Sequence, residues 1–145
     1  MNQRFNSPTK FDYPSIYIFV ICILCVLSII AYGTYRCKTP DFQDPLTGSF
    51  FEGEAKNFMD GWGIIHFVFY GVLAYLFPRK LPLIFLFGVA WEIIESIFHD
   101  HPFYISKCNY NLSTDQQAGW WYGRWQDIVM NSCGMALGYL IRMNQ

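Results

Sequence analysis

Ionisable side chains interrupt several of the most apolar stretches of this sequence. An aspartate and a histidine stand six residues apart, two glutamates stand three apart, and a further aspartate precedes an asparagine by four residues: Asp60, His66, Glu92, Glu95, Asp127 and Asn131. Ionisable groups inside apolar helices are costly, and they usually face a bundle interior or a watery cavity where they serve a function. These positions therefore indicate a polar site rather than scattered surface charge.

Carboxylates held at one depth repel one another unless they are protonated or neutralised by a cation. A hard divalent cation with oxygen ligands neutralises them well, which favours calcium, with manganese or magnesium as alternatives. The expected cation ligands, followed by the expected supporting residues, are Glu92, Glu95 and Asp127, then Asp60, Asn131 and His99. Histidine titrates near neutral pH, so His66 is suited to be a catalytic general base.

Plainer interpretations of the same residues stay open. Asp60 and Asp127 could each be only the N-cap of the helix that follows, because aspartate favours that position. Glu92 and Glu95 could lie at a helix end with their carboxylates reaching water. His66 could be a hydrogen-bonded packing residue.

Four apolar stretches must position these side chains: residues 15–33, 59–77, 81–98 and 126–141. Each is close to the roughly 20 residues that a helix needs to cross about 30 Å of hydrocarbon. The chain is 53% hydrophobic and only 14% charged, which is too apolar for an ordinary soluble domain. The sequence therefore predicts an all-α, multi-pass transmembrane bundle that forms one domain over residues 1–145, with a polar tail at 1–14.

Alternating helix direction brings the ionisable residues to one membrane face. Asp60 lies where the second span begins, and His66 lies about 9 Å deeper at 1.5 Å per residue. The third span leaves by the same face, so Glu95 and Glu92 lie about 5 and 9 Å below it, and Asp127 opens the fourth span there. In that last span Gly134 and Gly138 have the small-residue spacing that lets helices approach closely.

The net charge and the positions of the cysteines indicate which partners and which side of the membrane to expect. The net charge of −1 argues against a nucleic-acid partner and favours membrane lipids or proteins as partners, while the oligomeric state stays open. The Arg79-Lys80 turn and the glycosylation sequon at Asn111 favour cytoplasmic termini. Cys37 and Cys108 would then share the oxidising side, where a disulfide between them is a hypothesis.

The motifs resemble the core of the eukaryotic base-exchange phosphatidylserine synthases. They are Asp60-x5-His66, Trp91-Glu92-Ile93-Ile94-Glu95, the pair Trp120-Trp121, and Asp127-Ile128-Val129-Met130-Asn131 followed by Gly134 and Gly138. The resemblance implies phospholipid headgroup exchange, in which His66 deprotonates the hydroxyl of a small alcohol such as serine. It also implies that Glu92, Glu95 and Asp127 bind calcium and orient the lipid phosphate.

Smaller bacterial membrane proteins share the layout as well. The segment Asp127-x3-Asn131-x2-Gly134 is similar to the last helix of VanZ-like proteins, and WEIIES and DIVMNS are similar to segments of another family of short membrane proteins. This second resemblance implies an alternative function as a non-enzymatic VanZ-like or structural envelope protein. The chain departs from the synthases beside the paired tryptophans, where Ala118-Gly119 and Tyr122 replace acidic residues.

Overall fold

The long elements among the described residues are all helices, as the sequence predicts. The computed structural model describes residues 12–39, 44–47, 50, 59–99 and 123–145. Its elements, in chain order, are α1 (Tyr13–Lys38), the 3-10 turn η1 (Pro45–Thr47), α2 (Gly61–Leu76), the 3-10 turn η3 (Pro78–Lys80), α3 (Leu81–His99) and α5 (Trp125–Met143). Each predicted span coincides with one long helix, and no helix end differs from its prediction by more than five residues.

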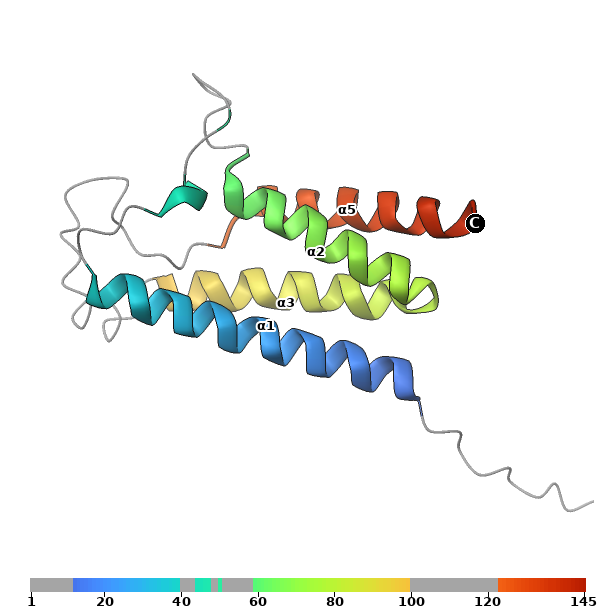
Figure 1. Cartoon of the computed structure of the whole chain (residues 1–145), viewed down its shortest axis with the longest axis horizontal. Coiled ribbons are helices and arrows are strands. Elements are labelled where there is room, and N and C mark those ends of the chain that lie inside the picture. The colour runs from blue at the N-terminus through green and yellow to red at the C-terminus, as the bar shows by residue number, and fades with distance from the viewer. Residues whose placement is uncertain (1–11, 40–43, 48–49, 51–58, 100–122) are drawn as a thin grey trace, which may run out of the picture.

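The four helices lie side by side with their axes roughly along one direction (Figure 1). In this view α2 and α5 form the upper pair, and α3 and α1 lie below them. The start of α1, the η3 turn and the C-terminus lie at one end of the bundle, while the starts of α2 and α5 lie at the other end. At the first of these ends, Lys80 pairs with Asp12 and so ties the η3 turn to the start of α1.

Backbone contact between α2 and α5 forms the tightest interface of the described bundle. A Cβ atom added at Gly134 would lie 2.0 Å from the carbonyl oxygen of Phe67, and one added at Gly138 would lie 1.9 Å from the carbonyl oxygen of Gly71. Only glycine fits where two backbones approach this closely. The spacing of Gly134 and Gly138 thus has the role that the sequence predicts.

The core lies between this helix pair and the other two helices. Leu73 of α2, Ile84 of α3 and Ile18 of α1 are fully buried and belong to one hydrophobic cluster. On its edge, Phe19 of α1 packs against Phe87 of α3 with the ring centroids 4.9 Å apart. Apolar side chains from α1 thereby hold this helix against the others.

One helix is by itself long and apolar enough to cross a membrane. Within the described residues this is α1, over Tyr13–Tyr35. The helix α2 and the segment Pro78–Ile97 meet the same standard only as a pair, bent by 107° at the break between them. The apolar span near the N-terminus supports membrane association.

Several predictions fall on parts of the chain outside the described residues. These are most of the tail at 1–14, the sequon at Asn111, the pair Trp120-Trp121, and one partner of the hypothetical disulfide, Cys108. For His99 and Cys37 the structure describes the helical backbone only.

Candidate functional site

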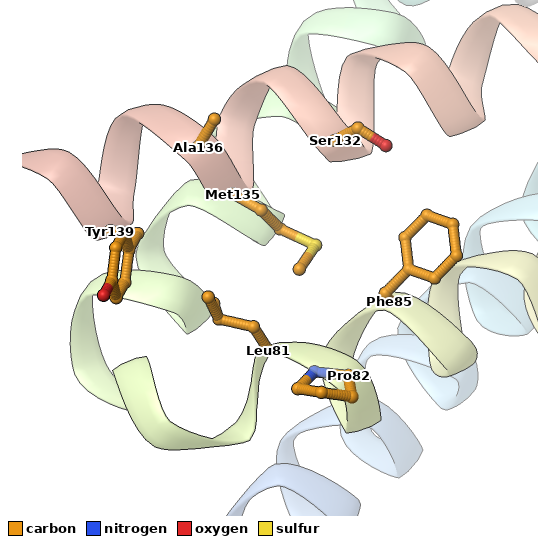
Figure 2. A pocket seen from close by; sticks show the side chains of 7 residues that line it. All are labelled: Leu81, Pro82, Phe85, Ser132, Met135, Ala136 and Tyr139. Carbon is orange, nitrogen blue, oxygen red and sulfur yellow. The ribbon is translucent and has the colours of Figure 1, made fainter.

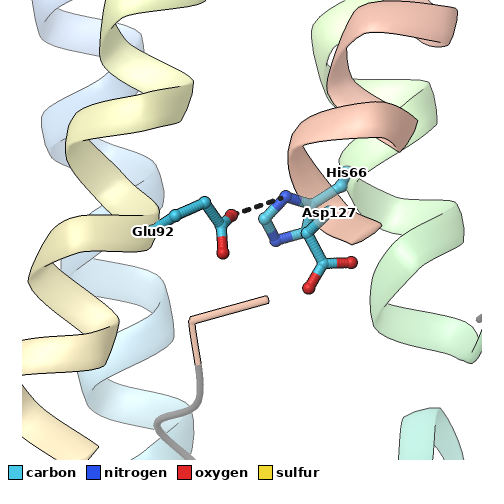
Figure 3. A group of neighbouring side chains, drawn as sticks. All are labelled: His66, Glu92 and Asp127. Atoms are coloured by element: carbon cyan, nitrogen blue, oxygen red, sulfur yellow. Dashed lines mark ion pairs between the residues drawn. The ribbon is translucent and has the colours of Figure 1, made fainter. Parts of the chain in front are cut away.

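Three of the predicted site residues converge inside the bundle. His66 comes from α2, Glu92 from α3 and Asp127 from α5, and one potential ligand atom of each lies within 4.8 Å of the others. Figure 3 shows the three side chains pointing toward one another. Glu92 is only 4% exposed and Asp127 6% exposed, so both carboxylates are nearly removed from solvent. This group could hold a metal ion.

A neighbouring amide sets the orientation of the imidazole. Nδ1 of His66 lies 3.0 Å from Oδ1 of Asn131, and it also lies 3.5 Å from Oε1 of Glu92. Because an amide oxygen only accepts hydrogen bonds, Nδ1 carries the proton in this arrangement. The other ring nitrogen, Nε2, then keeps its lone pair. A histidine in this tautomer can bind a cation or accept a proton.

Two buried polar atoms beside the imidazole have no hydrogen-bond partner among the described residues. One is Oε1 of Glu92 and the other is Nδ2 of Asn131, which is itself only 2% exposed. The second oxygen of Glu92 accepts a hydrogen bond from the backbone N–H of Arg124 at 3.0 Å. A buried polar atom without a partner is costly, so each such atom in a folded protein needs an explanation. A ligand held between these side chains would supply one.

Asp127 lies in the first turn of α5 and does not cap that helix. The N-cap position belongs to Arg124, so the alternative that Asp127 is only a cap is wrong. Its carboxylate also reaches the first turn of α2, where a Cβ atom added at Gly63 would lie 3.5 Å from Oδ1 of Asp127. The positive ends of two helix dipoles therefore favour negative charge at this point.

Asp60 caps α2 and pairs with an arginine from the other side of the site. One of its carboxylate oxygens accepts a hydrogen bond from the backbone N–H of Gly63 at 2.9 Å, which satisfies a free donor of the first turn. The other oxygen pairs with Nη1 of Arg124 at 3.0 Å. Asp60 thus has the N-cap role and also neutralises a charge at the mouth of the site.

Glu95 lies near the three converging residues but is not one of them. It is half-buried, and its carboxylate interacts with Trp91 one turn earlier. Three residues turn a helix by about 300°, so Glu95 points roughly 60° away from Glu92. Among the predicted cation ligands, Glu92 and Asp127 therefore converge on His66, whereas Glu95 belongs to their surroundings.

Two residues with structural roles at this end of the bundle were not predicted from the sequence. Arg124 contacts both Asp60 and Glu92, and the signal that could have revealed it is a basic residue just before a helix whose first turn carries an aspartate. Asp44 is buried and accepts hydrogen bonds from Tyr32 at 2.8 Å, from Trp62 at 3.1 Å and from the backbone of Leu46 at 2.9 Å. It links α1, η1 and α2 from within a polar connection, and its sequence context carries no comparable signal.

Acidic side chains outnumber basic ones in the site. Among the described residues around the three converging side chains, the acidic and basic groups are Asp60, Glu92, Glu95, Asp127, His66 and Arg124. Four carboxylates face one guanidinium and one imidazole, so with the carboxylates ionised the site carries excess negative charge even when the imidazole is protonated. This excess of acidic groups favours the binding of a cation.

Comparison with known proteins adds no relative to this picture, because no family model, no curated protein and no solved structure matches the chain.

Proposed function

We propose that this chain is a multi-pass integral membrane protein whose four helices form a bundle around a divalent-cation site. Apolar side chains exposed on the three later helices support the membrane location, among them Val72 of α2, Leu86 of α3 and Leu140 of α5. In this arrangement the site lies near one membrane face, and both termini lie on the opposite, cytoplasmic side. The η3 turn with Arg79 and Lys80 is on that cytoplasmic side too.

The observation that carries the cation proposal is Oε1 of Glu92, which accepts no hydrogen bond from the described residues and has only the imidazole of His66 at 3.5 Å as an ion-pair contact. It is buried beside the carboxylate of Asp127 and the imidazole of His66, in a site with more acidic than basic groups. In the proposed site the carboxylates of Glu92 and Asp127 hold the ion. Calcium is the first candidate because the donors are mainly carboxylate oxygens, and manganese is the second because an imidazole is within reach.

The chemistry that we propose for the site is exchange of a phospholipid headgroup. A bound divalent cation supplies positive charge that stabilises the phosphodiester as negative charge builds on its oxygens. The incoming alcohol forms a new P–O bond while the P–O bond to the resident headgroup breaks. Nε2 of His66 accepts the proton of the incoming hydroxyl and returns it to the leaving alkoxide, so the net proton balance is zero.

Two neighbouring side chains, Asn131 and Arg124, support this chemistry. Asn131 accepts from Nδ1, which leaves the basic lone pair on Nε2. Arg124, whose side chain is 30% exposed, stands at the mouth of the site, where a guanidinium suits a phosphate. A small alcohol such as serine is the expected second substrate.

The cation proposal is tested by unfolding the purified full-length protein in detergent with and without calcium or manganese. Binding at a hundredfold excess over Kd adds about 2.7 kcal/mol to the free energy of unfolding, which shifts the unfolding temperature by several degrees. We expect Glu92→Gln and Asp127→Asn to lose that shift. The matched control is Asp12→Asn, which removes one carboxylate at the far end of the bundle and should keep it. A shift that persists in Glu92→Gln would contradict the proposal.

A second candidate is a non-enzymatic cation site, in which His66 is a third ligand. It is favoured by the hydrogen bond from Nδ1 to Asn131, because metal-bound histidines commonly donate their other ring N–H in this way. The variant His66→Ala separates the two candidates. If His66 is the base, the variant keeps the calcium shift and loses serine exchange in reconstituted phosphatidylcholine liposomes. If His66 is a ligand, the variant loses the shift, and the wild-type protein shows no exchange.

A further inference from the structure

An apolar groove runs along the outer side of α3 and α5, away from the polar site. Its volume is about 370 Å³, and α3 lines one wall while α5 lines the other. Figure 2 shows the lining side chains, which are Leu81, Pro82 and Phe85 on α3 and Ser132, Met135, Ala136 and Tyr139 on α5. Apart from the hydroxyl groups of Ser132 and Tyr139, the lining is hydrocarbon or thioether. A groove of this size falls within the range of small-ligand sites.

The groove lies along the same two helices, α3 and α5, that carry Glu92 and Asp127. On α3, Phe85 lies seven residues before Glu92, so both project from one face of the helix. On α5, Met135 lies on the side that carries Asn131, whereas Ser132, Ala136 and Tyr139 lie further round the helix from Asp127. Between the groove and the site, Gly88 of α3 leaves room for the side chain of Asn131, because a Cβ atom added at Gly88 would lie 3.0 Å from Nδ2 of Asn131. The polar site and the apolar groove therefore lie at successive levels of the same helix pair.

The depths along α5 match the two parts of a lipid. At 1.5 Å per residue, Ser132 lies about 7.5 Å beyond Asp127 and Tyr139 lies about 18 Å beyond it. A hydrocarbon core about 30 Å thick gives each leaflet about 15 Å for its chains. A headgroup at Asp127 would thus place its acyl chain alongside the groove.

We propose that this groove binds one acyl chain of the phospholipid whose headgroup enters the site of Glu92 and Asp127. The inference rests on the proposed function. It adds that an acyl chain of the substrate lipid contributes to binding. The apolar lining supplies affinity for hydrocarbon without selecting a headgroup. The charged side chains of the polar site select the headgroup.

Native mass spectrometry of the full-length protein, extracted with mild detergent from phosphatidylcholine vesicles, tests this assignment. Two variants fill the groove from α5, Ala136→Trp and Ser132→Trp. The matched control is Ala90→Trp, since Ala90 is exposed on α3 and is outside the lining. We expect the wild type to carry one retained phospholipid. Both filling variants should lower its occupancy roughly tenfold, the change expected when about two methylene groups lose their burial. The control should keep it.

Calcium-dependent unfolding of the same proteins separates the groove from the cation site. Ala136→Trp should keep the calcium shift, because it leaves Glu92, Asp127 and His66 in place. Retained lipid in both filling variants would overturn the groove assignment and leave the cation site standing. If the wild type showed no calcium shift while the filling variants lost lipid, the cation site would be overturned and the groove assignment would stand.

The same spectra test two other ways in which the assignment could fail. A wild-type protein without retained lipid, or equal lipid loss in Ala90→Trp, would contradict a specific chain site. A wild-type dimer that becomes a monomer in the filling variants would show that a second copy of the chain occupies the groove, and this too would overturn the proposal.

Discussion

Replacing Gly134 by alanine should separate α2 from α5 and disturb the polar site at once. The added Cβ atom would start 2.0 Å from the carbonyl oxygen of Phe67, so the helices must move apart locally by about 1 Å or more to reach an allowed contact. Overpacking of this kind costs about 1–3 kcal/mol, while the change from glycine to alanine returns up to about 1 kcal/mol in helix propensity. We therefore expect a net loss of about 1–2 kcal/mol.

The same displacement should weaken the contact between His66 and Asn131. Their 3.0 Å contact spans α2 and α5, and a further 1 Å would take it beyond hydrogen-bonding distance. Gly134→Ala should therefore lower both the unfolding temperature and the calcium-dependent rise of that temperature in detergent solution.

A second glycine of the same interface provides the control. A Cβ atom added at Gly71 would lie 3.1 Å from the carbonyl oxygen of Gly134, a tight contact that a shift of a few tenths of an ångström relieves. The gain in helix propensity then offsets most of the cost, and Gly71→Ala should change the free energy of unfolding by less than about 1 kcal/mol. Equal stability of Gly134→Ala and the wild type would refute the reasoning, since it would mean that the two backbones are not in contact.

Three further perturbations test other parts of the fold. Asp44→Ala leaves three part-buried donors without their shared acceptor and should cost about 2–3 kcal/mol in chemical unfolding, against about 1 kcal/mol for Tyr32→Phe, which removes one hydrogen bond. Equal losses would contradict the shared role of the carboxylate. The hydrogen bond from Lys80 lowers the pKa of Asp12 below 3.8, so this pair stabilises the fold above that value and ceases to do so as the pH falls through the lowered pKa. The unfolding temperatures of the wild type and Asp12→Asn should therefore differ slightly at neutral pH and converge in acid, and a constant gap would argue against the pair. Gly123→Ala would bring a Cβ atom within 2.3 Å of the α3 backbone, so it should displace Gly123 and Arg124 from α3 and reduce the calcium shift. An unchanged shift would mean that the contact of Gly123 with α3 does not support the site.

Alternating helix direction was enough to predict that His66, Glu92 and Asp127 lie near one another. His66, Glu92 and Asp127 are far apart in the sequence, and their depths follow from where each apolar stretch begins and ends. The helix boundaries were predictable for the same reason, because polar connections and the Pro78 turn interrupt the apolar stretches. Periodicity also predicted that small residues would let α5 approach another helix.

Rotation about the helix axes was harder to predict than depth. Glu92 and Glu95 were treated as equivalent ligands, although a difference of about 60° in direction places only Glu92 in the converging group. The contribution of Arg124 escaped prediction because it depends on how the segment before α5 lies across α3, and no periodic pattern describes such a segment. Asp44 escaped for a related reason, since its donors come from three separate elements.

Asn131 connects the packing of the bundle with the chemistry of its polar site. Its Oδ1 fixes the tautomer of His66, while its Nδ2 lies against Gly88 without a hydrogen-bond partner among the described residues. Gly134, less than one turn further along α5, sets how closely this amide approaches α2. Close helix packing is therefore the reason that an asparagine is long enough to reach the imidazole. Any change that loosens the glycine contact should lower the stability of the bundle and also weaken the preference for the tautomer with its lone pair on Nε2 of His66. A change at Glu92 should instead affect cation binding without separating the helices.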